Sequence, residues 1–341
     1  MSLYIPYEEM KSTIRQAMLK AGVPEDKAEI CAEIHTASSA DGVESHGLNR
    51  VPRFIDYLER GLVDPLAEPE IISSRGAVER IDGHLGIGIT NALFAADRAV
   101  ELAKVHGIGC VALRNTTHWM RGGTYAHRTA EKGFMGISWI CTESCMPLWG
   151  SDEMSVGNNP LCIGIPRDGS PVVLDMAMSQ YAYGKLGVYE LAGKQTEYPC
   201  GFDEEGKMPY DPGAVLKTKR IMPTGYWKGS GLALALDLAG TMMSCGKCTH
   251  EISEPRDGSC GGCTQIFITY DPNLFGDYDE VLKKTEARVA AVNAAHPSDP
   301  TRPVQWPGEG TAKRRAKSKE RGVTANEKVW EEVCRLAARI E

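Results

Sequence analysis

The chain has 341 residues, of which 42% are hydrophobic and 24% charged, and its 45 acidic residues outnumber its 38 basic ones to give a net charge of -7. This composition is that of a globular protein long enough for two domains, and its mild acidity argues against nucleic-acid binding, which needs a concentrated basic face. Because no apolar run reaches the roughly 18 residues that span a bilayer and the start of the chain lacks the apolar segment of a signal peptide, we expect a cytoplasmic protein without membrane contact.

The first part of the chain has the pattern of three helices. Apolar residues recur at helical spacing in a segment that ends at Gly22, in one from Pro24 to about Asp41, and in one from Val51 to Gly61.

The central part alternates short apolar runs with longer helical patterns. A helix is expected at residues 91–105, a second, buried helix at residues 232–243, and further helices at residues 278–293 and 326–340, the last with an apolar stripe that ends at Ile340. The strand-like runs are residues 71–72, 78–81, 108–113, 135–140, 161–165, 172–174 and, as a late central strand, 265–270.

These elements predict an α/β (α+β) fold with helices at both ends of the chain. We expect a helical domain formed by residues 1–75 and completed by about 277–341, and an α/β domain formed by residues 76–276.

Several common motifs are absent. No G-x-G-x-x-G follows a strand, and the chain has no P-loop, no H-E-x-x-H and no G-x-S-x-G. A dinucleotide, if the protein binds one, therefore has to be held by something other than a Rossmann domain.

The segment Ser45-His46-Gly47 lies in a short link before the third helix, and Arg50 follows one helical turn later. An imidazole can exchange a proton near neutral pH, and a guanidinium group can hold a carboxylate with two hydrogen bonds. A proton donor beside a carboxylate clamp is what a keto-acid reductase needs. The same spacing also fits a capping Ser45 followed by surface side chains.

A second polar segment, residues 115–123, directly follows the strand at residues 108–113 and contains His118, Trp119 and paired glycines. Loops at strand ends often hold functional groups. The alternative is a turn with the tryptophan packed as a lid.

Three further segments are candidates for binding an anion. A buried strand ends at Asp175, where an aspartate can also cap a turn. The glycine-rich helix start that contains Trp227 and Lys228 offers free N–H groups to a pyrophosphate, or else is a cap with exposed aromatics. A turn at residues 306–310 precedes the basic run 313–321, which is typical of a solvated helix face.

Cys245, Cys248, Cys260 and Cys263 form two C-x-x-C pairs that are separated by eleven residues. Four thiolates at this spacing can surround a zinc ion. The alternatives are reduced thiols in a surface loop and a redox pair.

Taken in order, three motifs resemble the malate/L-lactate dehydrogenase type 2 family, which lacks a Rossmann domain. They are the SHGLNRVPRF segment at residues 45–54, HGIGCVALRNTTHWMRGG at residues 106–123 and PTGYWKGSG at residues 223–231. The resemblance covers nearly the whole chain. It implies a separate, non-Rossmann NAD(P)-binding α/β domain, a homodimer, and no metal.

The resemblance also implies roles for particular residues. His46 matches the catalytic proton donor, and Arg50 and His118 match residues that line the substrate site. It implies NADH as the cofactor, with NADPH as an alternative. The matching cofactor-binding residues are Pro171, Val172, Val173, Leu174, Asp175, Met176, Ala177, Trp227, Lys228, Gly308, Glu309 and Gly310.

The expected activity is reduction of the 2-keto group of a small sugar acid, such as 2,3-diketo-L-gulonate. One alternative keeps the chemistry and changes the substrate to malate, lactate, ureidoglycolate or a related 2-hydroxy acid. Another is a zinc-binding, non-catalytic protein on a reductase scaffold.

Overall fold

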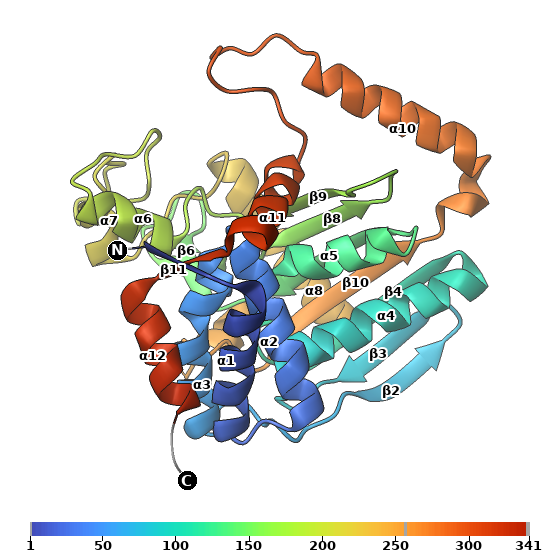
Figure 1. Cartoon of the computed structure of the whole chain (residues 1–341), viewed down its shortest axis with the longest axis horizontal. Helices are drawn as coiled ribbons and strands as arrows, with labels where there is room; N and C mark the ends of the chain where they lie inside the picture. Colours follow the sequence, from blue (N-terminus) through green and yellow to red (C-terminus); the bar gives the residue numbers. More distant parts are fainter. Residues whose placement is uncertain (1, 256–257, 339–341) are drawn as a thin grey trace.

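A seven-stranded mixed sheet lies at the centre of the chain, with strand order β2-β3-β4-β10-β5-β8-β9 (Figure 1). The structure is a computed structural model that describes residues 2–255 and 258–338. The sheet strands are β2 (Glu70–Arg75), β3 (Val78–Asp82), β4 (Ile108–Thr116), β5 (Met135–Cys141), β8 (Leu161–Ile165), β9 (Val172–Met176) and β10 (Cys263–Tyr270).

All seven predicted strands belong to this sheet, and the late strand β10 is central as expected. Only β3 and β4 run parallel, and the other neighbouring strands are antiparallel. The predicted mixed α/β class is therefore confirmed, and the sheet is not the parallel, doubly wound sheet of a Rossmann domain.

Helices cover both faces of the sheet. The helix α4 (Gly88–His106) connects the parallel strands β3 and β4 and lies with α5 (Gly122–Glu131) on one face, and α8 (Trp227–Ser244) lies on the other (Figure 1). Close packing requires small residues at the contacts. A Cβ atom on Gly109 would meet the backbone of α4, and one on Gly240 of α8 would lie 2.6 Å from the Cys141 sulfur.

The helix α8 differs from the prediction that it is buried. Its small residues face the sheet, whereas Leu234, Leu238 and Met242 point away from it, with Leu238 54% and Met242 83% exposed. A helix that is apolar all round predicts burial. Periodicity could not show that one apolar side of α8 is left uncovered in the single chain.

The N-terminal and C-terminal segments share a second hydrophobic core. The strand β1 (Ser2–Ile5) pairs antiparallel with β11 (Val323–Asn326), and α12 (Glu327–Ala337) packs on α1. The predicted row of apolar residues along the last helix is confirmed up to Leu336. Ile340, at which the predicted row ends, lies outside the described residues. The other helices of this unit are α1 (Tyr7–Lys20), α2 (Glu25–Ala40) and α3 (Val51–Glu59).

The predicted domain boundaries stay a prediction. β2 pairs with β3 in the central sheet although it precedes residue 76, and α10 (Tyr278–Asn293) projects away from the shared core of the chain ends (Figure 1).

Among the described residues, no helix combines the length and apolarity needed to cross a membrane.

The remaining elements are short or peripheral. They are the strands β6 (Ser144–Pro147) and β7 (Met154–Gly157), the helices α6 (Tyr183–Leu191), α7 (Pro212–Thr218), α9 (Thr249–Ser253) and α11 (Glu309–Arg321), and the 3-10 turns η1 (Glu44–His46), η2 (Leu48–Arg50) and η3 (Pro272–Phe275).

His35 on α2 is fully buried, and its Nδ1 lies 3.2 Å from the carbonyl oxygen of Gly47. Burial lowers the pKa of His35 to about 4, because the charged imidazolium is poorly solvated there. The unfolded chain, with an ordinary histidine pKa, binds the proton first as the pH falls. His35 therefore stabilises the fold fully above pH 6.5, and this contribution is lost on acidification toward pH 4.

In the wild type, the free energy of unfolding falls as the pH is lowered from 7 to 4.5. We predict that this fall is about 2 kcal/mol smaller in His35→Gln. Urea unfolding at the two pH values measures this difference. His296→Gln, which changes an exposed histidine, is the control and should leave the pH dependence unaltered. An unchanged pH dependence in His35→Gln would contradict the assignment.

Candidate active site

A cavity of about 490 Å³ opens between the helical unit and the carboxyl end of β9. Four stretches of chain meet at its wall: the link before η2, the loop after β4 with the start of α5, the strand β9, and the start of α11. Its principal lining residues are Ser45, His46, His118, Met120, Arg121, Gly123, His127, Pro171, Val173, Leu174, Asp175, Ala177, Pro307, Gly308, Thr311, Ala312 and Arg315.

The position of His46 is fixed by the glycine that follows it. Gly47 packs against α2 so closely that a Cβ atom would lie 2.7 Å from the Ser39 nitrogen and 2.9 Å from the His35 carbonyl oxygen. The Ser39 hydroxyl accepts a hydrogen bond from the Leu48 N–H at 2.8 Å. The backbone on the carboxyl side of His46 is therefore held against α2, which directs the imidazole into the cavity.

His46 and His118 face each other across the cavity, with their rings stacked at a centroid distance of 5.8 Å. The Met120 N–H donates to His118 Nδ1 at 3.0 Å, so a neutral His118 carries its proton on Nε2. Ser45 Oγ lies 3.0 Å from His46 Nδ1. In both rings a partner occupies Nδ1, which leaves Nε2 for a ligand.

Burial keeps both imidazoles neutral. It lowers the pKa of His46 to about 4, with a further contribution from Arg50, and it lowers the pKa of His118 well below its usual range. The Asp175 carboxylate opposes this lowering of the His46 pKa. A bound anion would act in the same direction, because a nearby negative charge favours the imidazolium form.

Arg50 lies close enough to both histidines to affect their titration, although it is not part of the cavity lining described above. Its guanidinium group sits 6.0 Å from the ring centroid of Tyr57. Its Nε is buried and makes no hydrogen bond to any residue that the structure describes. An unsatisfied buried guanidinium nitrogen is suited to a carboxylate ligand.

Asp175 anchors the opposite wall at the end of β9. Its carboxylate accepts hydrogen bonds from the Gly123 N–H at 2.9 Å and from the Cys162 thiol at 3.3 Å, and Arg121 Nε lies 3.6 Å away. The carboxylate therefore caps the start of α5, where the helix dipole favours negative charge.

A buried ion cluster closes the back of the cavity. The Asp41 carboxylate accepts from Arg121 and from Arg315, whose Nε and Nη2 lie 2.7 Å and 2.8 Å from its oxygens. Arg315 Nη1 in turn donates to His127 Nε2 at 2.9 Å. With Asp175, which lies 3.6 Å from Arg121 Nε, the cluster sets two carboxylates against two guanidinium groups at the cavity wall.

The start of α11 gives the cavity an anion-binding edge. Gly308 is its N-cap and adopts a left-handed conformation with φ of 97°, and a Cβ atom there would lie 3.2 Å from the Val173 nitrogen. A 13-residue helix that starts at the cavity presents free N–H groups and a positive dipole end, as a pyrophosphate requires. These residues fit a dinucleotide cofactor.

The structure thus brings together many of the site residues expected from the sequence. His46, His118, Pro171, Val173, Leu174, Asp175, Ala177 and Gly308 line the cavity, whereas Arg50, Val172, Met176, Trp227, Lys228, Glu309 and Gly310 are outside its lining. Trp227 is largely exposed at the start of α8. The roles of all these residues remain predictions.

Sequence reasoning missed the ion cluster. It assigned the basic run 313–321 to a solvated helix face, which holds for most of the run, but Arg314, Arg315 and Ser318 on one side of α11 contact the end of α2. Arg314 Nε donates to the Asp41 carbonyl oxygen at 3.0 Å, and Ser318 donates to the Ala40 carbonyl oxygen at 2.8 Å. The spacing of these three residues along one helix face was the available signal.

The four cysteines of the C-x-x-C pairs do not form one cluster among the described residues. The thiol of Cys245 accepts from Arg80, and Cys263 donates to the Cys260 carbonyl oxygen at 2.8 Å. Cys248 lies instead beside His250 and Glu251. The alternative of one zinc site formed by all four cysteines is therefore not supported by the described residues.

Two neutral histidines beside buried guanidinium groups, in a cavity edged by an anion-binding helix start, define a dehydrogenase of small acids. The comparison with known proteins agrees with this class. Residues 5–334 match the family model described as malate/L-lactate dehydrogenase, and the chain belongs to this family.

Two similar relatives are bacterial enzymes. The chain is 41% identical over 331 residues to the 2,3-diketo-L-gulonate reductase of Pasteurella multocida, covering 96% of this chain and 98% of the relative. It is 39% identical over 330 residues to the enzyme of the same name from Escherichia coli, with the same coverage.

Solved structures of the family have the same fold. The malate dehydrogenase of Entamoeba histolytica superposes with a TM-score of 0.93 at 25% identity, covering 99% of this chain and 98% of that one. The sulfolactate dehydrogenase of Methanocaldococcus jannaschii superposes with a TM-score of 0.90 at 27% identity, covering 98% and 97%. The predicted family is confirmed, and the chain is an oxidoreductase.

We predict that Gly47→Ala lowers kcat/KM by at least about tenfold, because the new methyl group displaces the link that positions His46 by forcing it away from α2. Steady-state kinetics and thermal unfolding of the variant measure the two effects. Gly187→Ala on α6, where a Cβ atom meets nothing within 4 Å, is the matched control. Wild-type kinetics in Gly47→Ala would show that this contact does not position the imidazole.

Proposed function

We propose that this enzyme reduces the 2-keto group of a small sugar acid with NADH or NADPH, and that its substrate is 2,3-diketo-L-gulonate, which becomes 3-keto-L-gulonate. The observation that carries the proposal is the pair of neutral histidines, His46 and His118, that face one cavity beside the Arg50 guanidinium group. The names of the bacterial relatives support the choice of substrate.

In this proposal the charges of the site select an acid. The guanidinium group of Arg50, beside the cavity lining, holds the substrate carboxylate, and His118 donates from Nε2 to a carbonyl or hydroxyl oxygen. Because these donors are fixed by the surrounding packing, they orient the 2-keto carbon toward the β9 wall.

The proposed cofactor site lies on the other side of the cavity. The wall of β9 and the start of α11 would hold the dinucleotide, with Arg315 adding positive charge near its phosphates. When bound, the nicotinamide supplies the hydride that the protein itself cannot provide.

His46 supplies the proton. Its Nε2 donates to the alkoxide oxygen that forms at C2, and Ser45 at Nδ1 keeps the ring oriented. Burial keeps the His46 imidazole neutral at pH 7, so the proton has to be taken up with the substrate. The carboxylate of a bound acid supports this uptake, because it raises the pKa of His46.

A cofactor-oxidation assay with 2,3-diketo-L-gulonate tests the proposal directly. Both NADH and NADPH should be tried, and oxaloacetate, pyruvate and the keto acids corresponding to ureidoglycolate and sulfolactate should be compared at equal concentration. A kcat/KM at least about tenfold higher for 2,3-diketo-L-gulonate would support the substrate assignment. Preference for another acid would overturn that assignment, and no turnover with any acid would overturn the proposed reaction.

We predict that His46→Ala lowers kcat by roughly 10²–10⁴-fold, the usual contribution of a positioned proton donor, and leaves cofactor affinity unchanged. Stopped-flow turnover and fluorescence titration with the nicotinamide cofactor measure the two quantities. His296→Ala removes an exposed histidine and should retain full activity. Full turnover by His46→Ala would show that another group donates the proton.

We also propose that the enzyme is a cytoplasmic homodimer. The uncovered apolar side of α8, with Leu234, Leu238 and Met242, supports pairing with a second copy, since apolar patches of this kind mark association surfaces. The family resemblance implies the same assembly.

We predict that Leu238→Glu converts the dimer to a monomer, because it places a charge in the middle of this apolar surface. Light scattering after size-exclusion chromatography gives the mass of each variant. Val105→Glu changes another exposed apolar residue, at the end of α4, and should not alter the mass. A dimer that survives Leu238→Glu would place the interface elsewhere.

A further inference from the structure

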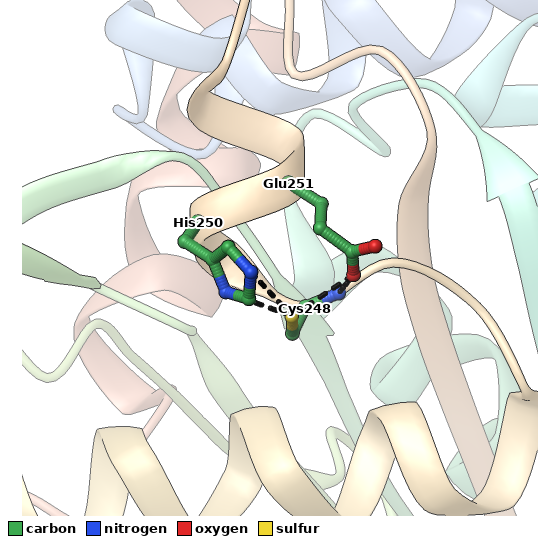
Figure 2. Close-up of side chains that lie close together, drawn as sticks. All are labelled: Cys248, His250 and Glu251. Carbon is green, nitrogen blue, oxygen red and sulfur yellow. Dashed lines mark hydrogen bonds between the residues drawn. The ribbon is translucent and has the colours of Figure 1, made fainter.

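A sulfur, a nitrogen and an oxygen donor meet just after α8, among residues that take no part in the cavity. The chain leaves α8 through Cys245, in a left-handed conformation, and begins the short helix α9 with Cys248 as its N-cap. The thiol of Cys248 lies between the side chains of His250 and Glu251 (Figure 2).

The distances define a tight cluster. The Cys248 sulfur lies 3.0 Å from His250 Nδ1 and 3.0 Å from Glu251 Oε2, and the ligand atoms of the three side chains all lie within 4.8 Å of one another. His250 is exposed, whereas Cys248 and Glu251 are half-buried. One side of the cluster is therefore open to solvent.

Helix capping explains only part of this arrangement. The carboxylate of Glu251 accepts from the Cys248 N–H at 3.0 Å, which forms a capping box with the N-cap side chain. Serine, threonine, aspartate and asparagine are the usual N-cap residues, so the cap does not require a thiol. The cap also does not require an imidazole in contact with the sulfur. The thiol and the imidazole are, however, both ligands that a metal site needs.

The donor set selects a class of metal ion. Thiolate and imidazole ligands suit Zn²⁺, whereas Ca²⁺ and Mg²⁺ take oxygen ligands. Sulfur and nitrogen ligands of a tetrahedral zinc ion lie about 3.5 Å apart, so a contact of 3.0 Å needs only a small opening to admit the ion. The buried Asp237, which accepts from the Thr249 N–H at 2.9 Å, adds negative charge nearby, and Lys247 is a neighbouring positive charge.

We propose that Cys248, His250 and Glu251 bind a zinc ion, with a water molecule as the fourth ligand on the exposed side. Binding replaces the S–H bond of Cys248 with an S–Zn bond and releases the proton to solvent, without any change of oxidation state. The ion would fasten the turn between α8 and α9. None of its ligands lines the cavity, so the site is separate from the reaction.

An activated thiol is the competing interpretation of a cysteine beside a histidine and a glutamate. Burial and the hydrogen bond with Glu251 raise the pKa of the Cys248 thiol, so it is protonated at neutral pH. Such a thiol is a poor nucleophile and becomes a thiolate only when a cation replaces its proton.

The test is a calorimetric titration of the full-length, chelator-treated protein with Zn²⁺, together with Co²⁺ substitution. We expect one Zn²⁺ per chain, and a thiolate-to-cobalt absorption band that Zn²⁺ removes. Cys248→Ser and Glu251→Gln both retain a capping box, so α9 should form in each while a metal ligand is lost or weakened. Cys248→Ser should weaken Zn²⁺ binding roughly 100-fold, the average contribution of one ligand in a structural site, and abolish the cobalt band.

Cys245→Ser is the matched control, because it removes an exposed thiol three residues away that contacts Arg80 and not the cluster. It should bind Zn²⁺ as the wild type does. Failure of the wild type to bind Zn²⁺ would overturn the proposal, and so would unchanged binding by a folded Cys248→Ser protein. Equal losses in Cys245→Ser and Cys248→Ser would instead indicate a site shared by more of the cysteines.

Discussion

The buried carboxylate of Asp41 is the interaction on which the arrangement of the cavity depends. It sits at the end of α2 and accepts from Arg121 at the start of α5 and from Arg315 on α11. A carboxylate removed from water is stable only when such partners satisfy it. The helical unit, the face of the sheet and the C-terminal helix α11 are thereby held at one point behind the active site.

The same cluster sets the electrostatic character of the site. Arg121 reaches toward Asp175, which opposes the lowered pKa of His46, and Arg315 extends the positive charge toward the start of α11. Charges placed for structural reasons therefore also determine which ligands the cavity prefers. Arg121 and Arg315 are each paired with a carboxylate in this cluster, so their guanidinium groups are held in fixed positions at the cavity wall.

Much of the fold follows from local patterns. The seven strands of the sheet coincide with short apolar runs, because burial of these residues drives strand formation. The helix α10 also has the bounds that its periodicity indicates, although Val289 is its only buried residue. The orientation of α8 did not follow, since a helix that is apolar all round contains no signal for which side meets the sheet. In α8 the small residues face inward, and only close packing against Cys141 explains that choice.

The site was only partly visible in the sequence. His46 and His118 stand in polar links next to regular elements, where functional groups are common. The pairing of Asp41 with Arg315 joins residues far apart in the chain, and no local pattern reports such a contact. The C-x-x-C spacing was misleading for the same reason, since it could not show that Cys248 lies against its own neighbours instead of the other cysteines.

The pairing of β1 with β11 has a consequence for the order in which the molecule is assembled. Ser2 lies opposite Asn326, so β1 has no partner until residue 326 has been synthesised. The sheet, whose strands all precede residue 271, can fold earlier on the ribosome. Because α11 and the helical unit supply two walls of the cavity, the cavity is complete only after residues 309–326 have joined the segment that begins with β1.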